Sequence, residues 1–461
     1  MSRRVLQSRV FRSKGICRVA ITVAYLASIC SPAMAGGGNF RNSAVGGVSI
    51  DVEGVVGPPS DSGRRLYLEQ LRKEVKSAEG PLNTPVELRM VSLRGLETAC
   101  EDAVKNNLGQ LPDEVKFLAG LQRIRYVFVY PEENDIVLAG PGEGWRINDD
   151  ATVVGITTGR PVLHLDDFLV AMRTVHEARR GGISVSIDPT AEGTRNLQEL
   201  FDAHRGRPLN PTPQFEAAAK QAFGPQMVTL TGVPDTSRFA RVLVAADYRM
   251  KRLAMNLEKS PVRGFGSYLE MIKNSRVAGD VNPRWWMACN YDPMAASDDK
   301  LAWELRGPGV KVMTEDEFVT ADGTRSATGK TSAAAKRWAD NMTDKYDELS
   351  AADPVFGELR NLMDMCVVSA LIEKERLCEV AGCSLPLLTS ASSELALAEW
   401  NAAKKISPEV SFLRTRNSWI VTASGGVQIE SWQVASRTAA DSNVSVVRKR
   451  AAPVSKSLWW Q

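Results

Sequence analysis

Histidine and carboxylate side chains gather at one place in this chain of 461 residues. The residues are His164, Asp166, Asp167, His176 and Glu177. On a strand followed by a helix, His176 would lie about three helical turns from His164 and Asp166, too far to share one metal ion. We therefore prefer a structural interpretation, in which Asp166 caps the helix, Asp167 favours its N-terminal dipole and His176 its C-terminal end. We predict no metal site, no cofactor and no catalytic residue.

Two glycine-rich loops resemble phosphate-binding loops without meeting their requirements. Residues 140–144 follow a predicted strand, but the third glycine of the dinucleotide-binding pattern is missing and Glu143 would repel a phosphate. Residues 323–331 contain Gly-Lys-Thr, but five residues rather than four separate the two glycines. We interpret both as structural loops, the second ending in Thr331 or Ser332 as a helix cap.

Trp285 and Trp286 are the best candidates for a binding site. Neighbouring residues of a strand point to opposite faces, so one ring can lie in the core while the other is exposed. An exposed tryptophan near Arg284, Asn290 and Tyr291 could stack on a sugar ring or a peptide. The alternative is that a large side chain simply covers one face of a sheet.

A carboxylate-dependent hydrolase would use Asp166, Asp167 and Asp188 as its acid and base. This mechanism requires two carboxyl groups about 5–9.5 Å apart in a cleft. The parts of a serine hydrolase are not assembled, because the sequence has only three histidines and no G-x-S-x-G pattern.

A hairpin over residues 121–145 is the element around which the rest of the chain is organised. Tyr126, Phe128 and Tyr130 follow the two-residue period of a strand. The next five residues have the composition of a turn, and residues 136–139 form a second apolar run. Because both runs are apolar on nearly all sides, we predict a buried hairpin at the centre of a sheet.

Strand and helix patterns alternate between residues 123 and 257, which predicts a fold of the α/β (mixed α+β) class. A mixed sheet flanked by helices is followed by a smaller β-hairpin and helical-hairpin unit. Ser424-Gly425-Gly426 is a turn pattern that predicts another hairpin. The predicted segments are a signal peptide (1–35), an extended Gly-rich lead-in (36–63), an α/β domain (64–280), a β-strand plus helical-hairpin unit (281–390), and a C-terminal helix, β-hairpin and polar tail (391–461).

The N-terminal segment has the three parts of a secretory signal peptide. Six basic residues and no acidic ones are followed by an apolar run of about a dozen residues and then by small residues. Ala33 and Ala35 match the A-x-A pattern, so we predict cleavage after Ala35 and a periplasmic or secreted mature protein. An uncleaved anchor is disfavoured because so short a run barely crosses the ~30 Å hydrocarbon layer. We predict no transmembrane span after cleavage.

The charge of the mature chain argues against nucleic acid as a partner. The full chain has a net charge of +3, and removal of the six positive residues leaves about −3. The one basic cluster consists of residues 448–450 and Lys456, which we interpret as a solvated tail.

Five of the seven cysteines remain after cleavage, an odd number that is too small for a disulfide scaffold. The best candidate pair is Cys378 with Cys383, which are separated by four residues where a helix is predicted to end. Cys100 and Cys366 lie on apolar helix faces and are predicted to be buried.

Several stretches of the sequence carry a resemblance to a known family. They include LQRIRYVFVYPEENDIVLAGPGEGW, ISVSIDPTAEGTRNLQ, ARVLVAADYRMKRLAMNLE and RWWMACNYDP. In this order they resemble a family of exported planctomycete proteins known only as a domain of unknown function, over roughly residues 86–375. The resemblance implies bacterial origin, export and a shared architecture, but no activity and no catalytic residue. We expect a non-enzymatic, envelope-associated binding or assembly protein whose partner is an envelope protein or glycan, with the hydrolase acting on an envelope polymer as the alternative.

Overall fold

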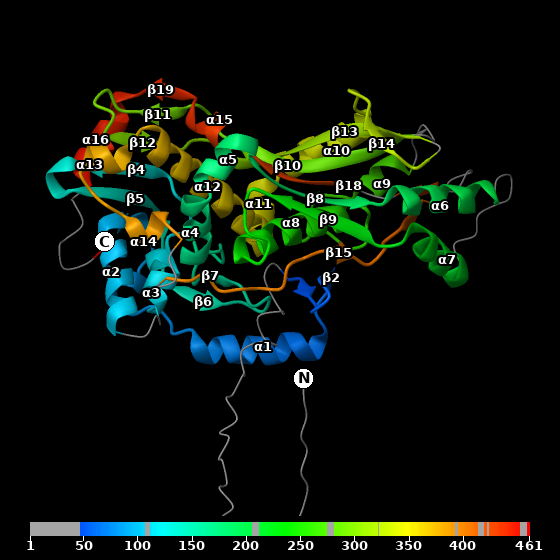
Figure 1. Ribbon diagram of the computed structural model, residues 1–461, viewed down its shortest axis with the longest axis horizontal. Coiled ribbons are helices and arrows are strands. Elements are labelled where there is room, and N and C mark those ends of the chain that lie inside the picture. The colour runs from blue at the N-terminus through cyan, green and yellow to red at the C-terminus, as the bar shows by residue number, and fades with distance from the viewer. Residues whose placement is uncertain are drawn as a thin grey trace, which may run out of the picture. The chain divides into compact units, whose positions relative to one another are not determined.

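The computed structural model describes residues 47–106, 111–204, 212–273, 281–320, 322–391, 395–413, 419–421, 424–451 and 459–461. All of them belong to one compact unit within Asn39–Gln461. Helices and mixed parallel and antiparallel strands make up this unit (Figure 1), which confirms the predicted mixed α+β class. The predicted signal peptide, residues 1–35, lies outside the described residues.

The larger of the two main sheets has nine strands in the described part of the chain. In spatial order they are β1 (Ser49–Ile50), β2 (Val55–Gly57), β15 (Lys405–Ile406), β9 (Gln226–Thr231), β8 (Ile183–Pro189), β18 (Ser424–Ile429), β10 (Val281–Asn290), β13 (Gly309–Val319) and β14 (Arg325–Ala327). β10 and β13 pair antiparallel from Val281 opposite Phe318 to Asn290 opposite Gly309. β18 runs parallel to β10 on one side and antiparallel to β8 on the other, so a strand from late in the chain fills the middle of the sheet.

One face of this sheet packs on the core and the other faces solvent. In β8 the side chains of Ile183, Val185 and Ile187 are buried, whereas Ser184 and Ser186 between them are partly exposed. This two-residue alternation is typical of a strand with one solvent-exposed face. We call the solvent-facing side of the nine-stranded sheet the open face.

In the described part of the chain, this sheet is covered by α8 (Arg238–Ala254), α10 (Ala333–Asp344) and α12 (Pro354–Lys374). α8 contacts β8 and β18, while α10 and α12 contact β13. α12 is buried along almost its whole length, and in Figure 1 it lies between the strands of the two main sheets. Because α12 is buried on all sides, its charged residues need partners, and Glu358 and Asp364 are paired with arginines. Its first residue is a proline, whose missing N–H would be unpaired there anyway.

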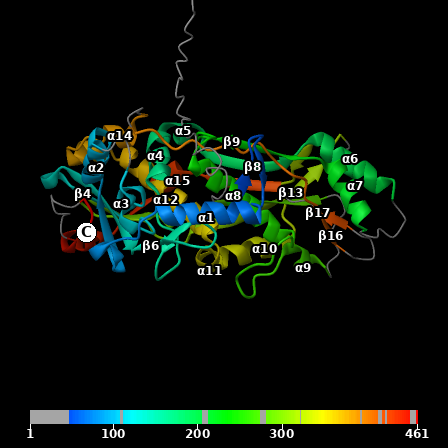
Figure 2. The ribbon, with the colours of Figure 1, turned by 90° about the horizontal axis from the view of Figure 1, so that it is seen from below.

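The other elements lie around these layers. The remaining helices are α1 (Asp61–Glu74), α2 (Leu93–Asn106), α3 (Asp113–Lys116), α4 (Leu165–Arg173), α5 (Val175–Gly181), α6 (Ala191–Asp202), α7 (Pro213–Phe223), α9 (Tyr268–Ile272), α11 (Tyr346–Ala352), α13 (Leu377–Ala381), α14 (Pro386–Thr389), α15 (Ser431–Ala435) and α16 (Ser442–Arg450), with 3-10 turns at Gly80–Asn83, Leu118–Gly120 and Pro131–Glu133. β6 (Trp145–Ile147) pairs with β7 (Val153–Gly155), and β16 (Ser411–Leu413) pairs with β17 (Trp419–Val421). Figure 2 shows α1 on the side turned to the viewer.

The second main sheet contains the predicted central hairpin. Its order is β19 (Thr438–Ala440), β11 (Met294–Ala296), β12 (Ala302–Glu304), β4 (Tyr126–Tyr130), β5 (Asp135–Gly142) and β3 (Val86–Ser92). β4 and β5 pair with each other from Tyr126 opposite Ala139 to Tyr130 opposite Asp135, and both are interior strands. Asn134 closes the turn with a left-handed φ of 50°, which asparagine adopts more readily than most residues. The predicted buried hairpin is therefore confirmed.

Two other predicted hairpins are wrong. The smaller β-hairpin expected after the mixed sheet, with strands at residues 284–290 and 300–306, does not form. β10 pairs with β13 and β18, whereas β12 belongs to the other sheet. Ser424, Gly425 and Gly426 are not a turn but the first half of β18. A Cβ on Gly425 would lie 1.6 Å from the backbone oxygen of Trp285, and one on Gly426 would lie 1.9 Å from that of Val185. The two glycines therefore permit a close approach of neighbouring strands.

The predicted boundary near residue 280 does not separate two sheets. β8 and β9 lie before it and share a sheet with β10 and β13, which follow it. The hairpin β4–β5 likewise shares a sheet with β11 and β12. Both sheets also take strands from the predicted C-terminal segment, β15 and β18 in the larger sheet and β19 in the other.

The basic C-terminal segment is solvated only in part, because Lys449 and Arg450 are exposed whereas Arg448 is buried. Residues 448–450 are the end of α16, and Arg448 is only 9% exposed. Its Nε donates a hydrogen bond of 2.8 Å to the backbone oxygen of Val129, and its guanidinium lies over the ring of Tyr130. A long arginine stem can cover apolar surface, so basic residues do not by themselves mark a solvated segment. Lys456 lies outside the described residues.

Replacement of Gly425 by alanine should destabilise the fold strongly. The added Cβ would collide with the Trp285 oxygen, and the φ of +144° disfavours any side chain. We expect the free energy of unfolding to fall by at least about 3 kcal/mol in urea denaturation. Gly181→Ala in α5 is the matched control, because nothing lies within 4 Å of its added Cβ, and it should change stability by less than about 1 kcal/mol. Equal stabilities of the two variants would contradict the close packing of β18.

Candidate functional site

β10 places the two candidate tryptophans on opposite faces of the nine-stranded sheet. Trp285 is fully buried, and its ring packs edge to face on Trp338 and Tyr268, with centroid separations of 5.1 and 4.9 Å. Trp286 belongs to the open face and is partly exposed. The structure thus has one core ring and one surface ring, and Trp286 alone is placed to touch a ligand.

Trp286 stands in a row of five residues across the open face. The strand register places it between Met313 on β13 and Gly426 on β18, and the row continues with Ser186 on β8 and Thr229 on β9. Neighbouring strands are about 4.8 Å apart, so the positions from Trp286 to Thr229 span about 14 Å. Gly426 has no side chain to cover the flank of the indole. We call these five residues the Trp286 row, in which an aromatic ring borders a strip of small, hydroxylated residues.

A second row beside it carries further polar side chains. The register places Gln428 on β18 next to Ser184 on β8 and then Thr231 on β9. The hydroxyl oxygens of Ser184 and Thr231 are 2.8 Å apart and share a hydrogen bond. Hydroxyl and amide groups both donate and accept hydrogen bonds without carrying a charge. From β18 to β9 the two rows form a neutral hydrogen-bonding strip beside one aromatic ring. At the other end of the second row, Lys311 on β13 lies opposite Ala288.

Paired charges border the Trp286 row on its other side. Oε2 of Glu317 accepts a hydrogen bond of 3.0 Å from the Ser424 hydroxyl and lies 2.8 Å from Nε of Arg325. Its Oε1 lies 3.6 Å from Nη1 of Arg284. Burial lowers the pKa of Arg325, and the charge of Glu317 opposes this. Arg284 and Arg325 both contact Glu317, so its negative charge partly neutralises their positive charges.

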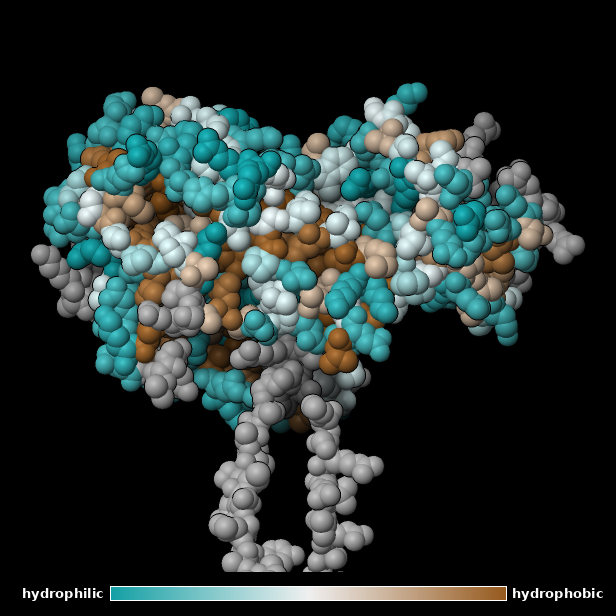
Figure 3. All heavy atoms as spheres, in the orientation of Figure 1, coloured by the Kyte–Doolittle hydropathy of each residue, from teal (hydrophilic) through white to brown (hydrophobic). Residues whose placement is uncertain are grey.

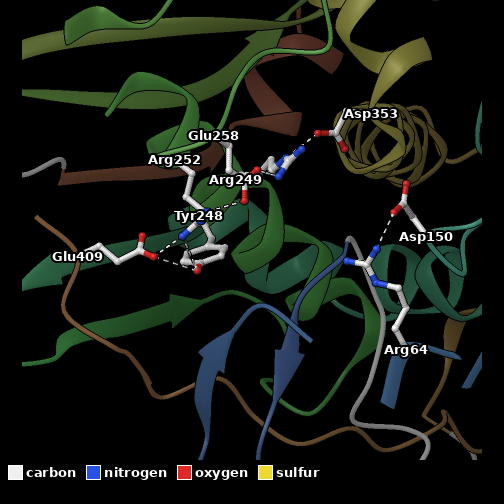
Figure 4. Close-up of polar contacts among 8 residues, drawn as sticks. All are labelled: Arg64, Asp150, Tyr248, Arg249, Arg252, Glu258, Asp353 and Glu409. Atoms are coloured by element: carbon white, nitrogen blue, oxygen red, sulfur yellow. Dashed lines mark hydrogen bonds and ion pairs between the residues drawn. The ribbon is translucent and has the colours of Figure 1, made fainter. Parts of the chain in front are cut away.

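A separate hollow of about 280 Å³ lies beside α8 and the start of α12, next to a network of ion pairs (Figure 4). Arg249 contacts Asp353 at 2.7 Å and also contacts Glu258. Arg252 contacts Glu258 at 2.6 Å and also contacts Glu409. Burial raises the pKa of Asp353, and the guanidinium of Arg249 opposes this. The network ties α8 and the loop after it to α12 and to the segment before β16.

Sequence reasoning did not find this network. Arg249 and Asp353 are 104 positions apart, and Arg252 and Glu409 are 157 apart, so no local spacing links them. Figure 4 also shows Arg64 of α1 facing Asp150 at 3.9 Å. Because each of these carboxylates faces a guanidinium, we interpret the network as a structural connection between elements.

The carboxylates of the hydrolase hypothesis do not form a shared site. Asp167 is 2% exposed and, together with Glu358, pairs with Arg238 in the core. Asp188 lies at the end of β8, in the register of the open face, and is partly exposed. Burial raises the pKa of Asp167 to about 7, and Arg238 opposes this. The geometry gives the hydrolase hypothesis no support.

Two details of the histidine–carboxylate cluster differ from the prediction. His164 occupies the cap position of α4, so Asp166 lies in the first turn rather than at the cap. The helix breaks at Thr174, whose hydroxyl donates to the backbone oxygen of Val170 and so competes with the helical pattern. His176 therefore lies at the start of α5 rather than at the end of a longer helix.

The two glycine-rich loops make structural contacts. Glu143 accepts hydrogen bonds of 2.9 Å from the backbone N–H groups of Thr157 and Thr158. Burial would raise the pKa of Glu143, but these hydrogen bonds and that of the Thr158 hydroxyl outweigh it and lower the pKa. Ser332 caps α10 by accepting a hydrogen bond from the N–H of Ala335, as predicted.

The described residues show neither a cluster that suits a metal ion nor a helix that suits a membrane. No three or more His, Cys, Asp or Glu side chains within those residues are grouped so that they could hold a metal ion. No helix in the same part of the chain is both long enough and apolar enough to cross a bilayer.

The fold and surface define a mixed α+β protein with a broad sheet face that carries one aromatic ring, a strip of hydroxyl groups and paired charges. A family model described as a protein of unknown function, DUF1598, matches residues 185–268. No curated protein and no solved structure matches the chain. The match runs from β8 to the start of α9 and confirms the resemblance to a domain of unknown function over that segment. Planctomycete origin and export stay predictions.

Replacement of Arg238 by methionine should destabilise the core by about 3–5 kcal/mol, because Asp167 and Glu358 would be left buried without a counter-charge. The measurement is urea denaturation at pH 8 and pH 5. The orphaned carboxyls should have pKa values above those of the unfolded chain, so the folded variant takes up protons as the pH falls and its deficit shrinks toward pH 5.

Arg180→Met is the control for this pair. Its partner Glu177 is exposed, so stability should change by less than about 0.5 kcal/mol. An Arg238→Met deficit below about 1 kcal/mol, or one that grows at lower pH, would show that Arg238 does not neutralise the two carboxylates.

Proposed function

We propose that the mature protein is a non-enzymatic binding protein of the cell envelope and that the open face is its binding surface. The basic N-terminal segment, the apolar run after it and the Ala33-x-Ala35 pattern support export. The resemblance to exported planctomycete proteins agrees with a bacterial envelope as its place of action. The binding role is carried by the partly exposed ring of Trp286 beside neutral hydrogen-bonding groups.

A neutral glycan is the partner that best suits this surface. A sugar ring has a flat C–H face that can pack on an indole, and hydroxyl groups that require donors and acceptors at its edge. The open face offers these in Trp286, Ser186, Thr229 and Gln428. A nucleic acid would require a basic surface, whereas the arginines beside Trp286 share Glu317.

A protein partner fits less well. A stable protein interface covers about 800 Å² on each side and centres on a cluster of apolar or aromatic anchors. In the Trp286 row the large apolar side chains are Trp286 and Met313, while Ser186 and Thr229 are small and polar. A strip of this composition favours stacking on a single ring with hydrogen bonds around it.

Trp286→Ala should weaken binding to a neutral envelope polysaccharide by about 10-fold, which corresponds to roughly 1.4 kcal/mol. The indole is the only large flat ring of the Trp286 row, so its removal takes away the stacking contact. Trp286→Phe keeps a ring and should retain most of the affinity. Affinities are measured by titration calorimetry against neutral polysaccharides that a glycan array has first identified.

Leu66→Ala provides the matched control for this experiment. Leu66 is 59% exposed on α1, so its removal also takes away a large apolar surface group but not the Trp286 row. Its affinity should equal that of the unmodified protein. If a folded Trp286→Ala variant kept its affinity, Trp286 would not be part of the binding site. If the protein captured an envelope protein but bound no glycan, the proposal that its partner is a glycan would be wrong.

Export should be visible at the N-terminus of the protein recovered from a bacterium that expresses the whole chain. Cleavage after Ala35 predicts that the mature protein begins at Gly36. N-terminal sequencing of the periplasmic or secreted fraction makes this measurement. A protein found only in the cytoplasm and still carrying residues 1–35 would contradict export.

A further inference from the structure

Cys378 and Cys383 lie on a short turn that is held firmly at both ends. α13 contains Cys378 and ends at Ala381, and Gly382 follows with a left-handed φ of 66°. Arg376, before the helix, also has a left-handed φ, of 54°. The backbone N–H of Cys383 donates a hydrogen bond of 3.0 Å to the oxygen of Cys378, which is the long bond of a Schellman helix end. The helix end thus draws the two cysteine backbones together.

Both cysteines of this turn are free and partly exposed. A disulfide requires two Cα atoms about 4.4–6.8 Å apart, and the backbone hydrogen bond between Cys378 and Cys383 holds these two residues close together. The neighbouring thiol of Cys383 lowers the pKa of Cys378, although burial opposes this, and the same interaction raises the pKa of Cys383. Of the two, Cys378 therefore has the greater thiolate character and is the better nucleophile.

The other three cysteines of the described chain are poor sites for the same chemistry. Cys100 and Cys366 are buried in the core. Burial raises the pKa of Cys100 and of Cys289 to about 12, so both thiols stay protonated at neutral pH. Reactivity toward an oxidant should accordingly concentrate at the α13 turn.

We propose that Cys378 and Cys383 are a redox-active dithiol, with Cys378 as the attacking thiol and Cys383 as the resolving thiol, and that its substrate is a low-molecular-weight disulfide. The Cys378 thiolate attacks one sulfur of the disulfide, forms a mixed disulfide and releases one thiolate. Cys383 loses its proton and attacks Cys378 Sγ, which forms the Cys378–Cys383 disulfide and releases the second thiolate. Two protein thiols are oxidised and one external disulfide is reduced to two thiols. This inference does not rest on the proposed glycan binding.

Cys378 is accessible to an external disulfide through a neighbouring hollow. Cys378 lines a hollow of about 270 Å³ together with His176, Glu373 and Arg376. On its other side the turn is docked on the central hairpin, because Nδ2 of Asn134 lies 3.3 and 3.4 Å from the backbone oxygens of Ala381 and Gly382. Closure of the disulfide would therefore fasten the connection between α12 and α14 beside the β4–β5 turn.

The test uses the full chain, reduced, freed of reductant and incubated with oxidised glutathione at pH 7.5. After alkylation and trypsin digestion, one peptide, residues 377–404, contains both cysteines. We expect this peptide to lose two hydrogen atoms, to resist alkylation, and to react at least 10-fold faster than Cys100, Cys289 or Cys366. Dithiothreitol should reverse the change.

Single variants separate the two roles. Cys383→Ser should retain glutathione on Cys378 as a stable mixed disulfide, because the resolving thiol is gone. Cys378→Ser should form the corresponding adduct at Cys383 at least 10-fold more slowly, and Cys289→Ser should behave like the unmodified protein. A peptide that stays reduced, or equal adduct rates in the Cys378→Ser and Cys383→Ser variants, would overturn the proposal.

Discussion

The nine-stranded sheet depends on the insertion of β18 between β8 and β10. Gly425 and Gly426 let the backbones approach closely where any side chain would collide. From the core side, the buried ammonium of Lys251 donates to the backbone oxygens of Ile187 and Gly425, at 2.6 and 3.3 Å, and pairs with Asp247. Burial lowers the pKa of Lys251, and the charge of Asp247 opposes this. The middle of the sheet is thus held by close packing and by one buried cation beneath it.

The position of β18 also determines which side chains lie on the open face. Because β18 fixes the register of β10, one tryptophan enters the core and the next one lies on the open face beside a glycine. The segment that matches the family of unknown function supplies β9 and most of β8, with Ser186 and Thr229 of the Trp286 row, and it also supplies α8 beneath the sheet. Trp286 itself comes from outside the match. Figure 3 shows, for the face turned to the viewer, apolar surface between hydrophilic regions, so apolar side chains also reach the surface elsewhere.

Buried arginine–carboxylate ion pairs also connect several elements of this protein. Arg123 makes two hydrogen bonds, of 2.9 and 3.0 Å, to Asp364 on α12, and the hydroxyl of Tyr291 donates to the same carboxylate at 2.7 Å. Arg238 joins α8 to α4 and α12 in the same way. Buried pairs of this kind add little net stability because both partners lose water, but a wrong arrangement leaves a buried charge unpaired. They therefore select which helices meet around α12.

The sequence by itself determined the local structure of this protein. The two-residue period of β4 and β8, the turn before Asn134, the cap at Ser332 and the helix end after Ala381 follow from a few neighbouring residues, and each could be predicted. It also predicted that Trp285 and Trp286 would face opposite ways. Only the tertiary structure decided which segments pair: that the two glycines of β18 form a strand interior, that Arg448 is buried, and that Arg249 meets Asp353. These contacts join residues far apart in the chain, and their free energy depends on the packing of the whole fold, so no local spacing pattern encodes them.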